Sequence, residues 1–172
     1  MSVASITEAR QYLTFKLDDE VFALDVANVR EILDMTPITK VPRTPDFMRG
    51  VINLRGNVVP VVDMRIKFGM RKAEDTINTC IIVVEVSFDG EKAVLGAMAD
   101  SVQEVFELDA DRIEPAPKIG TRLKTDFIKG IGKRENSFII MLDIDKAFSS
   151  EELSILNDTA ETSQAEDVPV EV

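Results

Sequence analysis

Carboxylates are the side chains of this 172-residue chain that come nearest to catalytic groups. The sequence has no histidine, which removes imidazole bases, imidazole metal ligands and phosphohistidine chemistry. Glu31, Glu85, Asp63 and Asp143 can be imagined as paired carboxylates. No phosphate-cradling glycine loop, metal-ligand spacing or nucleophile motif accompanies them. The sequence therefore predicts a protein that is not an enzyme and that holds no cofactor and no metal.

The single cysteine, Cys80, excludes an intrachain disulfide. It stands in the apolar run TCIIVVEV, where a cysteine packs as a small buried hydrophobe. The alternative is a reactive thiol, which would need a basic neighbour, and none lies close to it in the sequence.

An arginine stands in the middle of an apolar segment. Residues 47–68 read FMRGVINLRGNVVPVVDMRIKF, and Arg55 falls at the bend between Leu54 and Gly56. A guanidinium presents a planar fork of donors that suits carboxylates and carbonyl oxygens. Two interpretations stay open: Arg55 is a solvated turn residue, or the turn presents Arg55 to a partner.

The charge balance is acidic, with a formal net charge of −11. There is no basic tract, so binding to nucleic acid or to an anionic membrane surface is not expected. The N-terminal stretch has no signal-peptide pattern and no apolar run is long enough to span a bilayer. We therefore expect a cytoplasmic protein in which any membrane role comes from a partner.

The first part of the ordered chain predicts a hairpin followed by a helix. Residues 11–17 alternate in polarity and residues 20–24 return after a short turn. Over residues 25–35 the apolar side chains fall at helical spacing, with Asp25 as a possible N-cap. On that helix Glu31 faces away from the apolar stripe.

Short strands then continue at close spacing. We expect a buried strand at 78–88 that turns at Asp89-Gly90 and returns over 92–99. A strand or short helix at 102–108 and a loop at 109–126 follow. The chain then forms a hairpin at 127–144 that turns at Glu135-Asn136, and a helix at 149–156 capped by Ser149 or Ser150. This pattern favours an all-β fold with short helices. The domain covers residues 11–157, between a flexible N-terminus (1–10) and a disordered acidic tail (158–172). Truncation at Asn157 should leave binding intact.

One hairpin is used twice. Residues 46–68, DFMRGVINLRGNVVPVVDMRIKF, align without gaps with residues 126–148, DFIKGIGKRENSFIIMLDIDKAF, and share Asp, Phe, Gly, Asp and Phe at five positions. This predicts two similar small barrels in which Gly50 and Gly130 hold equivalent backbone positions. At the bend, however, Glu135 occupies the place of Arg55. The hairpin therefore does not need the arginine, which favours a role beyond the turn.

The chain resembles CheW, the family of chemotaxis coupling proteins. The likeness is carried by VREI at 29–32, FMRGVINLRG at 47–56, VPVVDMR at 59–65, RIEPAP at 112–117 and SEE at 150–152. It implies two SH3-like five-stranded β-barrels packed on a shared hydrophobic core. It also implies an adaptor that bridges chemoreceptor cytoplasmic tips to the regulatory domain of the histidine kinase CheA, in rings or arrays with the kinase at membrane-bound receptors. A scaffold of another receptor–kinase pathway, such as surface sensing or motility, is the alternative.

The resemblance also assigns site residues. Arg55 and Glu31 are expected to pair at the receptor-binding surface, and the remaining receptor-side candidates are Val29, Asn53, Val102 and Val105. Val29 and the pair Val102 and Val105 have the alternative of lying in the core. Gly50, Gly56 and Pro60 are expected to be structural or to face the kinase, with Pro60 marking an edge strand or a bulge.

Overall fold

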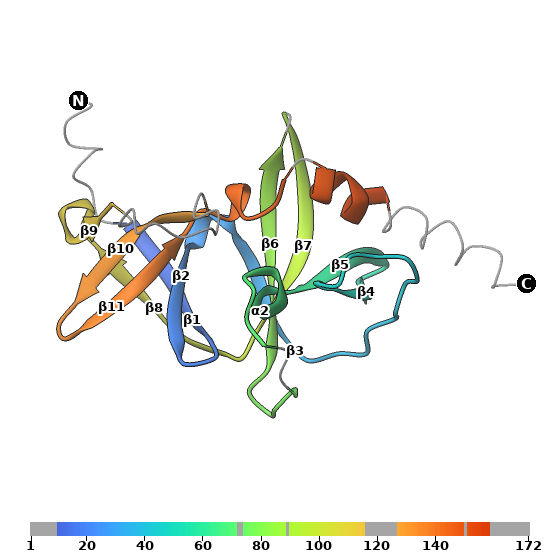
Figure 1. Cartoon of the computed structure of the whole chain (residues 1–172), viewed down its shortest axis with the longest axis horizontal. Helices are drawn as coiled ribbons and strands as arrows, with labels where there is room; N and C mark the ends of the chain where they lie inside the picture. The colour runs from blue at the N-terminus through green and yellow to red at the C-terminus, as the bar shows by residue number, and fades with distance from the viewer. Residues whose placement is uncertain (1–9, 72–73, 89, 116–126, 150, 159–172) are drawn as a thin grey trace, which may run out of the picture.

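The computed structural model describes residues 10–71, 74–88, 90–115, 127–149 and 151–158, and most of them lie in strands (Figure 1). The strands are β1 (Arg10–Leu17), β2 (Glu20–Asp25), β3 (Val29–Asp34), β4 (Met48–Leu54), β5 (Asn57–Asp63), β6 (Cys80–Phe88), β7 (Glu91–Ala99), β8 (Ser101–Leu108), β9 (Ile113–Glu114), β10 (Ile128–Arg134) and β11 (Ser137–Leu142). The helical segments are η1 (Val26–Asn28), α2 (Met64–Lys67), η2 (Ala110–Arg112), η3 (Ile144–Lys146) and a last helix over 151–158. The predicted all-β class with short helices is confirmed.

The strands form two sheets that lie side by side (Figure 1). The first has six strands in the order β8-β1-β2-β11-β10-β9, and the second has five in the order β3-β6-β7-β5-β4. The chain begins in the first sheet, builds all of the second sheet with β3 to β7, and then returns to complete the first. The expected two-part architecture is therefore present, although the first sheet has one strand more than predicted because the two-residue β9 joins it.

The two sheets repeat one topology, as the internal repeat predicted. Each contains a parallel pair beside the repeated hairpin, β5 with β7 in the second sheet and β11 with β2 in the first. Each hairpin has a register shift before its glycine, between Met48 and Gly50 and between Ile128 and Gly130. The peptide nitrogen of Asp63 donates to the oxygen of Phe47 at 2.7 Å, and Asp143 donates to Phe127 at 2.8 Å.

The repeated glycines lie where another backbone passes. A Cβ at Gly50 would come within 2.1 Å of the carbonyl oxygen of Thr39, and the φ of Gly50 is +145°. A Cβ at Gly130 would come within 2.7 Å of the carbonyl oxygen of Glu114. Thr39 and Glu114 therefore occupy equivalent places beside the two hairpins, and the need for glycine in both copies is steric.

The main core contains side chains from both sheets, so the two parts fold against each other. Phe15, Phe22 and Leu24 of the first sheet belong to the same buried cluster as Val62, Ile82 and Val84 of the second. Cys80 is part of this cluster, as predicted, and burial raises the pKa of its thiol.

The predicted helix over residues 25–35 is wrong. Only η1 is helical there, with Asp25 as its N-cap accepting from the nitrogen of Ala27 at 2.9 Å. Residues 29–34 form β3, which pairs with β6. The helical spacing of Val29, Ile32 and Leu33 is overridden by pairing with β6, whose residues 80–84 are buried. Glu31 consequently lies on the face of β3 that carries Leu33, whereas Val29 points to the opposite face and packs on the main core.

Pro60 does not mark an edge or a bulge. β5 lies between β4 and β7, and the register shift of this hairpin falls in β4. Pairing between β5 and β7 begins at Val61, one residue after Pro60. The absent N–H is therefore tolerated at a position where the parallel ladder has not yet started.

Other local predictions have mixed outcomes. Residues 102–108 were predicted as a strand or a short helix, and they belong to a strand, β8. The loop expected from residue 109 contains η2 and β9 before residue 116. Ser149 is the helix cap: its hydroxyl accepts from the nitrogen of Glu152 at 3.0 Å, while the Glu152 carboxylate accepts from the nitrogen of Ser149 at 2.9 Å. The predictions for residues 1–9, 116–126 and 159–172, and for Asp89 and Ser150, lie outside the described residues.

Candidate functional site

The β4–β5 turn positions Arg55. It is a two-residue turn in which Arg55 (φ 51°) and Gly56 (φ 85°) both take left-handed conformations, the geometry that suits the twist of a hairpin. The side-chain oxygen of Asn53 accepts from the nitrogen of Gly56 at 2.8 Å and fixes the turn. Glu135, the first turn residue of the second copy, has the same φ of 51°, so this conformation occurs in both hairpins and does not need an arginine.

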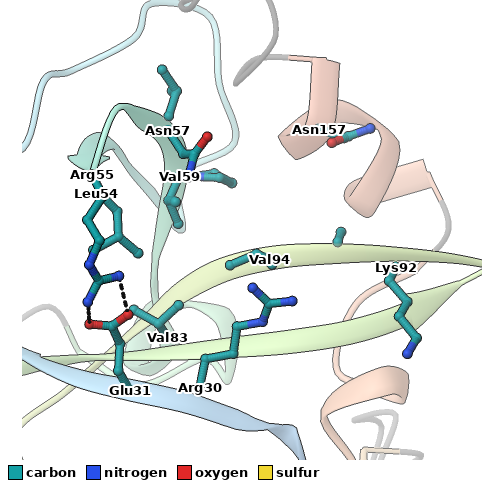
Figure 2. A pocket seen from close by; sticks show the side chains of 13 residues that line it. Arg30, Glu31, Leu54, Arg55, Asn57, Val59, Val83, Lys92, Val94 and Asn157 are labelled. Carbon is teal, nitrogen blue, oxygen red and sulfur yellow. Dashed lines mark hydrogen bonds and ion pairs between the residues drawn. The ribbon is translucent and has the colours of Figure 1, made fainter.

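Arg55 and Glu31 form a two-pronged ion pair, drawn with dashed lines in Figure 2. Nη1 and Nη2 of Arg55 lie 2.7 and 2.8 Å from the two carboxylate oxygens of Glu31. The Arg55 side chain is 71% exposed and that of Glu31 is 27% exposed. The hydrogen bonds from Arg55 lower the pKa of Glu31 below its ordinary value and outweigh the opposing effect of desolvation. Arg55 is therefore held in one orientation at the surface.

This ion pair forms one end of a cleft of about 290 Å³. The rest of the lining comes from β3, β4, β5, β6, β7 and the end of the last helix (Figure 2). Apolar side chains include Val59, Val83 and Val94, while Arg30, Lys92 and Asn157 supply polar atoms. Arg55 and Lys92 stand at opposite ends of the row of side chains, with Arg30 between them (Figure 2).

A bulge explains why two consecutive residues of one strand line the same cleft. Val29 pairs with Val84 and Glu31 pairs with Val83, so Arg30 is an extra residue in β3. A bulge re-aims the side chain of the extra residue, and Arg30 thereby joins Glu31 at the cleft. Nη2 of Arg30 also lies 3.1 Å from a carboxylate oxygen of Glu85, on the neighbouring strand β6.

The remaining predicted site residues are divided between the two sheets. Asn53, Gly56 and Pro60 lie with Arg55 in the β4–β5 hairpin, and Pro60 is buried and lines the cleft. Gly50 lies in β4 against Thr39. Val29 is half-buried and packs on the main core.

Val102 and Val105 belong to β8, the end strand of the first sheet, and so do not come from the sheet that carries Arg55. Val102 packs on the main core, whereas Val105 is 52% exposed. The structure therefore brings Glu31 and Arg55 together as predicted, and places the two valines on a strand of the other sheet.

Sequence reasoning missed Arg30, Lys92 and Asn157. Arg30 could have been noticed as a cation next to Glu31. The predicted helix over residues 25–35, however, pointed the two side chains in different directions. Lys92 and Asn157 carried no signal, because their place at the cleft depends on how β7 and the last helix pack.

The four carboxylates considered above do not gather at one site. Glu31 and Glu85 each pair with an arginine. Asp63 is buried and caps α2 by accepting from the nitrogen of Arg65 at 3.0 Å, whereas Asp143 makes no side-chain cap bond. Among the residues that the structure describes there is no cluster of three potential metal ligands and no helix long and apolar enough to cross a membrane.

Fold and site together define a class: an all-β protein of two repeat-related parts whose candidate site is a charged surface cleft suited to binding. The chain belongs to the CheW-like family, whose domain model, described as the CheW-like domain, matches residues 11–152.

Individual relatives agree with this membership over most of the chain. A chemotaxis protein CheW of Klebsiella aerogenes is 34% identical over 160 residues, covering 93% of this chain and 94% of that protein. A chemotaxis protein CheW of Rhizobium meliloti is 35% identical over 143 residues, covering 83% and 90%. The crystal structure of the scaffolding protein TtCheW from Thermoanaerobacter tengcongensis superposes with a TM-score of 0.74 at 35% identity, covering 84% of this chain and 96% of that one.

Proposed function

We propose that this chain is a non-enzymatic adaptor of bacterial chemotaxis that couples the cytoplasmic tips of chemoreceptors to the histidine kinase CheA. The proposal rests on the exposed, two-pronged Arg55–Glu31 pair at the mouth of a cleft, in a chain of the CheW-like family. The curated relatives are named as chemotaxis proteins and the solved relative is titled a scaffolding protein.

The receptor surface in this proposal is centred on Arg55. The guanidinium keeps exposed donors for carbonyl and carboxylate oxygens of a helical tip, and Glu31 holds its plane in a fixed direction. Asn53 supports the turn that presents it. Val29 shapes the strand beside Glu31, and the exposed Val105 with Val102 supplies a second, apolar contact from β8.

The kinase regulatory domain would bind a separate surface at the end of one of the two parts. Gly50, Gly56 and Pro60 keep the hairpin in shape for both contacts. The protein would work in the cytoplasm, recruited to arrays of membrane-bound receptors. Control of the kinase would come from receptor motion, and a ligand can act only through the difference in binding free energy between two signalling states.

A co-sedimentation assay tests this function. Receptor cytoplasmic fragments and CheA are mixed with and without the purified protein, and kinase activity is measured in the pellet. We expect the protein to be required for both co-sedimentation and kinase activation. Arg55→Ala should fold normally, because the equivalent hairpin of the second copy forms its turn without an arginine. The variant should nevertheless lose co-sedimentation and kinase activation.

Arg10→Ala is the matched control. Arg10 is an exposed arginine in a surface ion pair, 3.2 Å from Asp25, but it belongs to the first sheet. Its loss should leave coupling unchanged. If Arg55→Ala retains full receptor-dependent kinase activity, the proposed receptor surface is wrong. If the wild-type protein binds neither partner, a scaffold for another receptor–kinase pathway replaces the proposal.

A further inference from the structure

The cleft beside Arg55 is basic, although the protein as a whole is acidic. The chain carries a net charge of −11, yet Arg30, Arg55 and Lys92 line the cleft and Glu31 is the acid among its lining residues. The cleft therefore favours an acidic ligand in spite of the field of the rest of the molecule.

The three cations are not equally available. Arg55 gives two hydrogen bonds to Glu31, and Arg30 is paired with Glu85. Lys92 is exposed, and none of the residues that the structure describes forms an ion pair with it. A carboxylate that approached Arg55 would share its guanidinium with Glu31, whereas all three donors of the Lys92 ammonium group are on offer.

The strand geometry ties Lys92 to the apolar wall of the cleft. Lys92 and Val94 are two residues apart in β7 and so point to the same face of the sheet. Val94 packs on the smaller buried cluster that contains Val59 and Val83, and all three residues line the cleft. A ligand that rests on this wall is therefore bounded by Arg55 at one end and by Lys92 at the other (Figure 2).

We propose that this cleft is a second part of the receptor-binding surface, and that Lys92 selects receptor tips that place an acidic side chain next to the residues that contact Arg55. This inference rests on the proposed function, because it names which feature of the receptor tip the cleft recognises. The partner segment combines an apolar side chain, which covers Val59 and Val94, with a carboxylate that pairs with Lys92.

The affinity of a purified receptor cytoplasmic fragment for the protein tests the inference. Lys92→Glu should weaken binding about tenfold at low salt, since a charge of the wrong sign at an interface repels the partner. Lys92→Arg should bind as wild type. The difference between Lys92→Glu and wild type should shrink in about 0.5 M NaCl, where charges at the surface are screened over a few ångströms.

Lys129→Glu is the matched control. Lys129 is an exposed lysine on β10 of the first sheet, and its substitution changes the net charge by the same amount. It should bind the fragment with nearly wild-type affinity. A fragment in which an acidic tip residue is changed to lysine should recover binding to Lys92→Glu, and this reversal identifies the partner group directly.

The outcomes separate the inference from the proposed function. If the fragment does not bind the wild-type protein, the proposed function fails and the inference fails with it. If Arg55→Ala abolishes binding while Lys92→Glu leaves it unchanged, the function stands and the inference is wrong. Equal losses in Lys92→Glu and Lys129→Glu would reduce the effect to net charge and would also overturn it. A last outcome is that deletion of residues 159–172 raises the affinity of the wild-type protein for the fragment but not that of Lys92→Glu. In that case the acidic residues 159–172, and not the receptor tip, are the ligand of the cleft, and the inference is wrong.

Discussion

Phe127 stacks on Phe68 with ring centroids 4.4 Å apart and planes 10° apart. In the repeat alignment Phe127 corresponds to Phe47 and Phe68 corresponds to Phe148. Those two counterparts also pack on each other, with centroids 6.0 Å apart. The two copies of the hairpin therefore exchange equivalent aromatic contacts, as two subunits do across a twofold axis.

This exchange fixes the two parts of the protein relative to each other. Phe148 is buried, and the Nζ of Lys67 lies 5.6 Å from the centre of its ring and 5.2 Å from that of Phe47. Lys67 in turn bonds both carboxylate oxygens of Glu152 in the last helix. We call the contact made by Phe47, Phe68, Phe127 and Phe148 the seam. Packing at the seam thus connects α2, the second hairpin and the last helix.

The first prediction concerns this seam. Phe148→Ala should lower the free energy of unfolding by about 3 kcal/mol or more, because it leaves a cavity in the main core. Phe138→Ala is the control, since Phe138 is 67% exposed and its loss should cost less than about 0.5 kcal/mol. Urea unfolding measures both. Equal costs for the two variants would mean that the seam is not closely packed.

The second prediction concerns Gly50. Gly50→Ala should cost about 3 kcal/mol, because the added Cβ would overlap the backbone of Thr39 and the φ of +145° strains any L-residue. Gly56→Ala should cost about 1 kcal/mol, since its Cβ would meet nothing within 4 Å and only the positive φ is unfavourable. Thermal unfolding of the pair checks the difference. A Gly50→Ala variant as stable as Gly56→Ala would refute the close approach of Thr39.

The third prediction concerns the start of the last helix. Ser149→Ala should lower the free energy of unfolding by about 1 kcal/mol, because the nitrogen of Glu152 loses its capping acceptor. Ser154→Ala, at an exposed position inside the same helix, should be neutral or slightly stabilising. Chemical denaturation distinguishes the two variants. A loss in Ser154→Ala as large as in Ser149→Ala would count against the cap.

The fourth prediction concerns the pH dependence of the Arg55–Glu31 pair. Hydrogen bonds from Arg55 place the pKa of Glu31 below its ordinary value of 4.5. A carboxylate with a lowered pKa in the folded state stabilises the protein at pH values above its ordinary pKa, and this contribution disappears as the pH falls through the lowered pKa. The ion pair should therefore be intact at neutral pH and lost only in acid.

A carbon-detected NMR titration of the Glu31 carboxyl group measures this pKa directly. In Arg55→Gln the pKa of Glu31 should rise, because the charge-assisted hydrogen bonds are gone while partial desolvation remains. A wild-type Glu31 that titrates at 4.5 or above would show that the ion pair is not populated in solution.

Much of the fold was predictable because its signals are local. The repeated Asp, Phe and Gly positions of the two hairpins indicated two equivalent parts, and both copies have the same bulge and a two-residue turn. The turn at Glu135 and the capping serine were also readable, because the relevant residues lie within four positions of one another. The residues at 47–56 and 59–65 were sufficient to suggest the family, and Arg55 stood out because the second copy lacks it.

The sequence by itself thus determined the hairpins, their duplication, the absence of histidine chemistry and the unusual arginine. Only the tertiary structure decided that residues 29–34 form a strand, because pairing with β6, about fifty residues away in the chain, overrides the helical spacing of their apolar side chains. The same pairing produces the bulge that turns Arg30 to the cleft and places Glu31 against Arg55. The tertiary structure also decided the position of Lys92, because a side chain on one hairpin faces a cleft only after distant strands have come together.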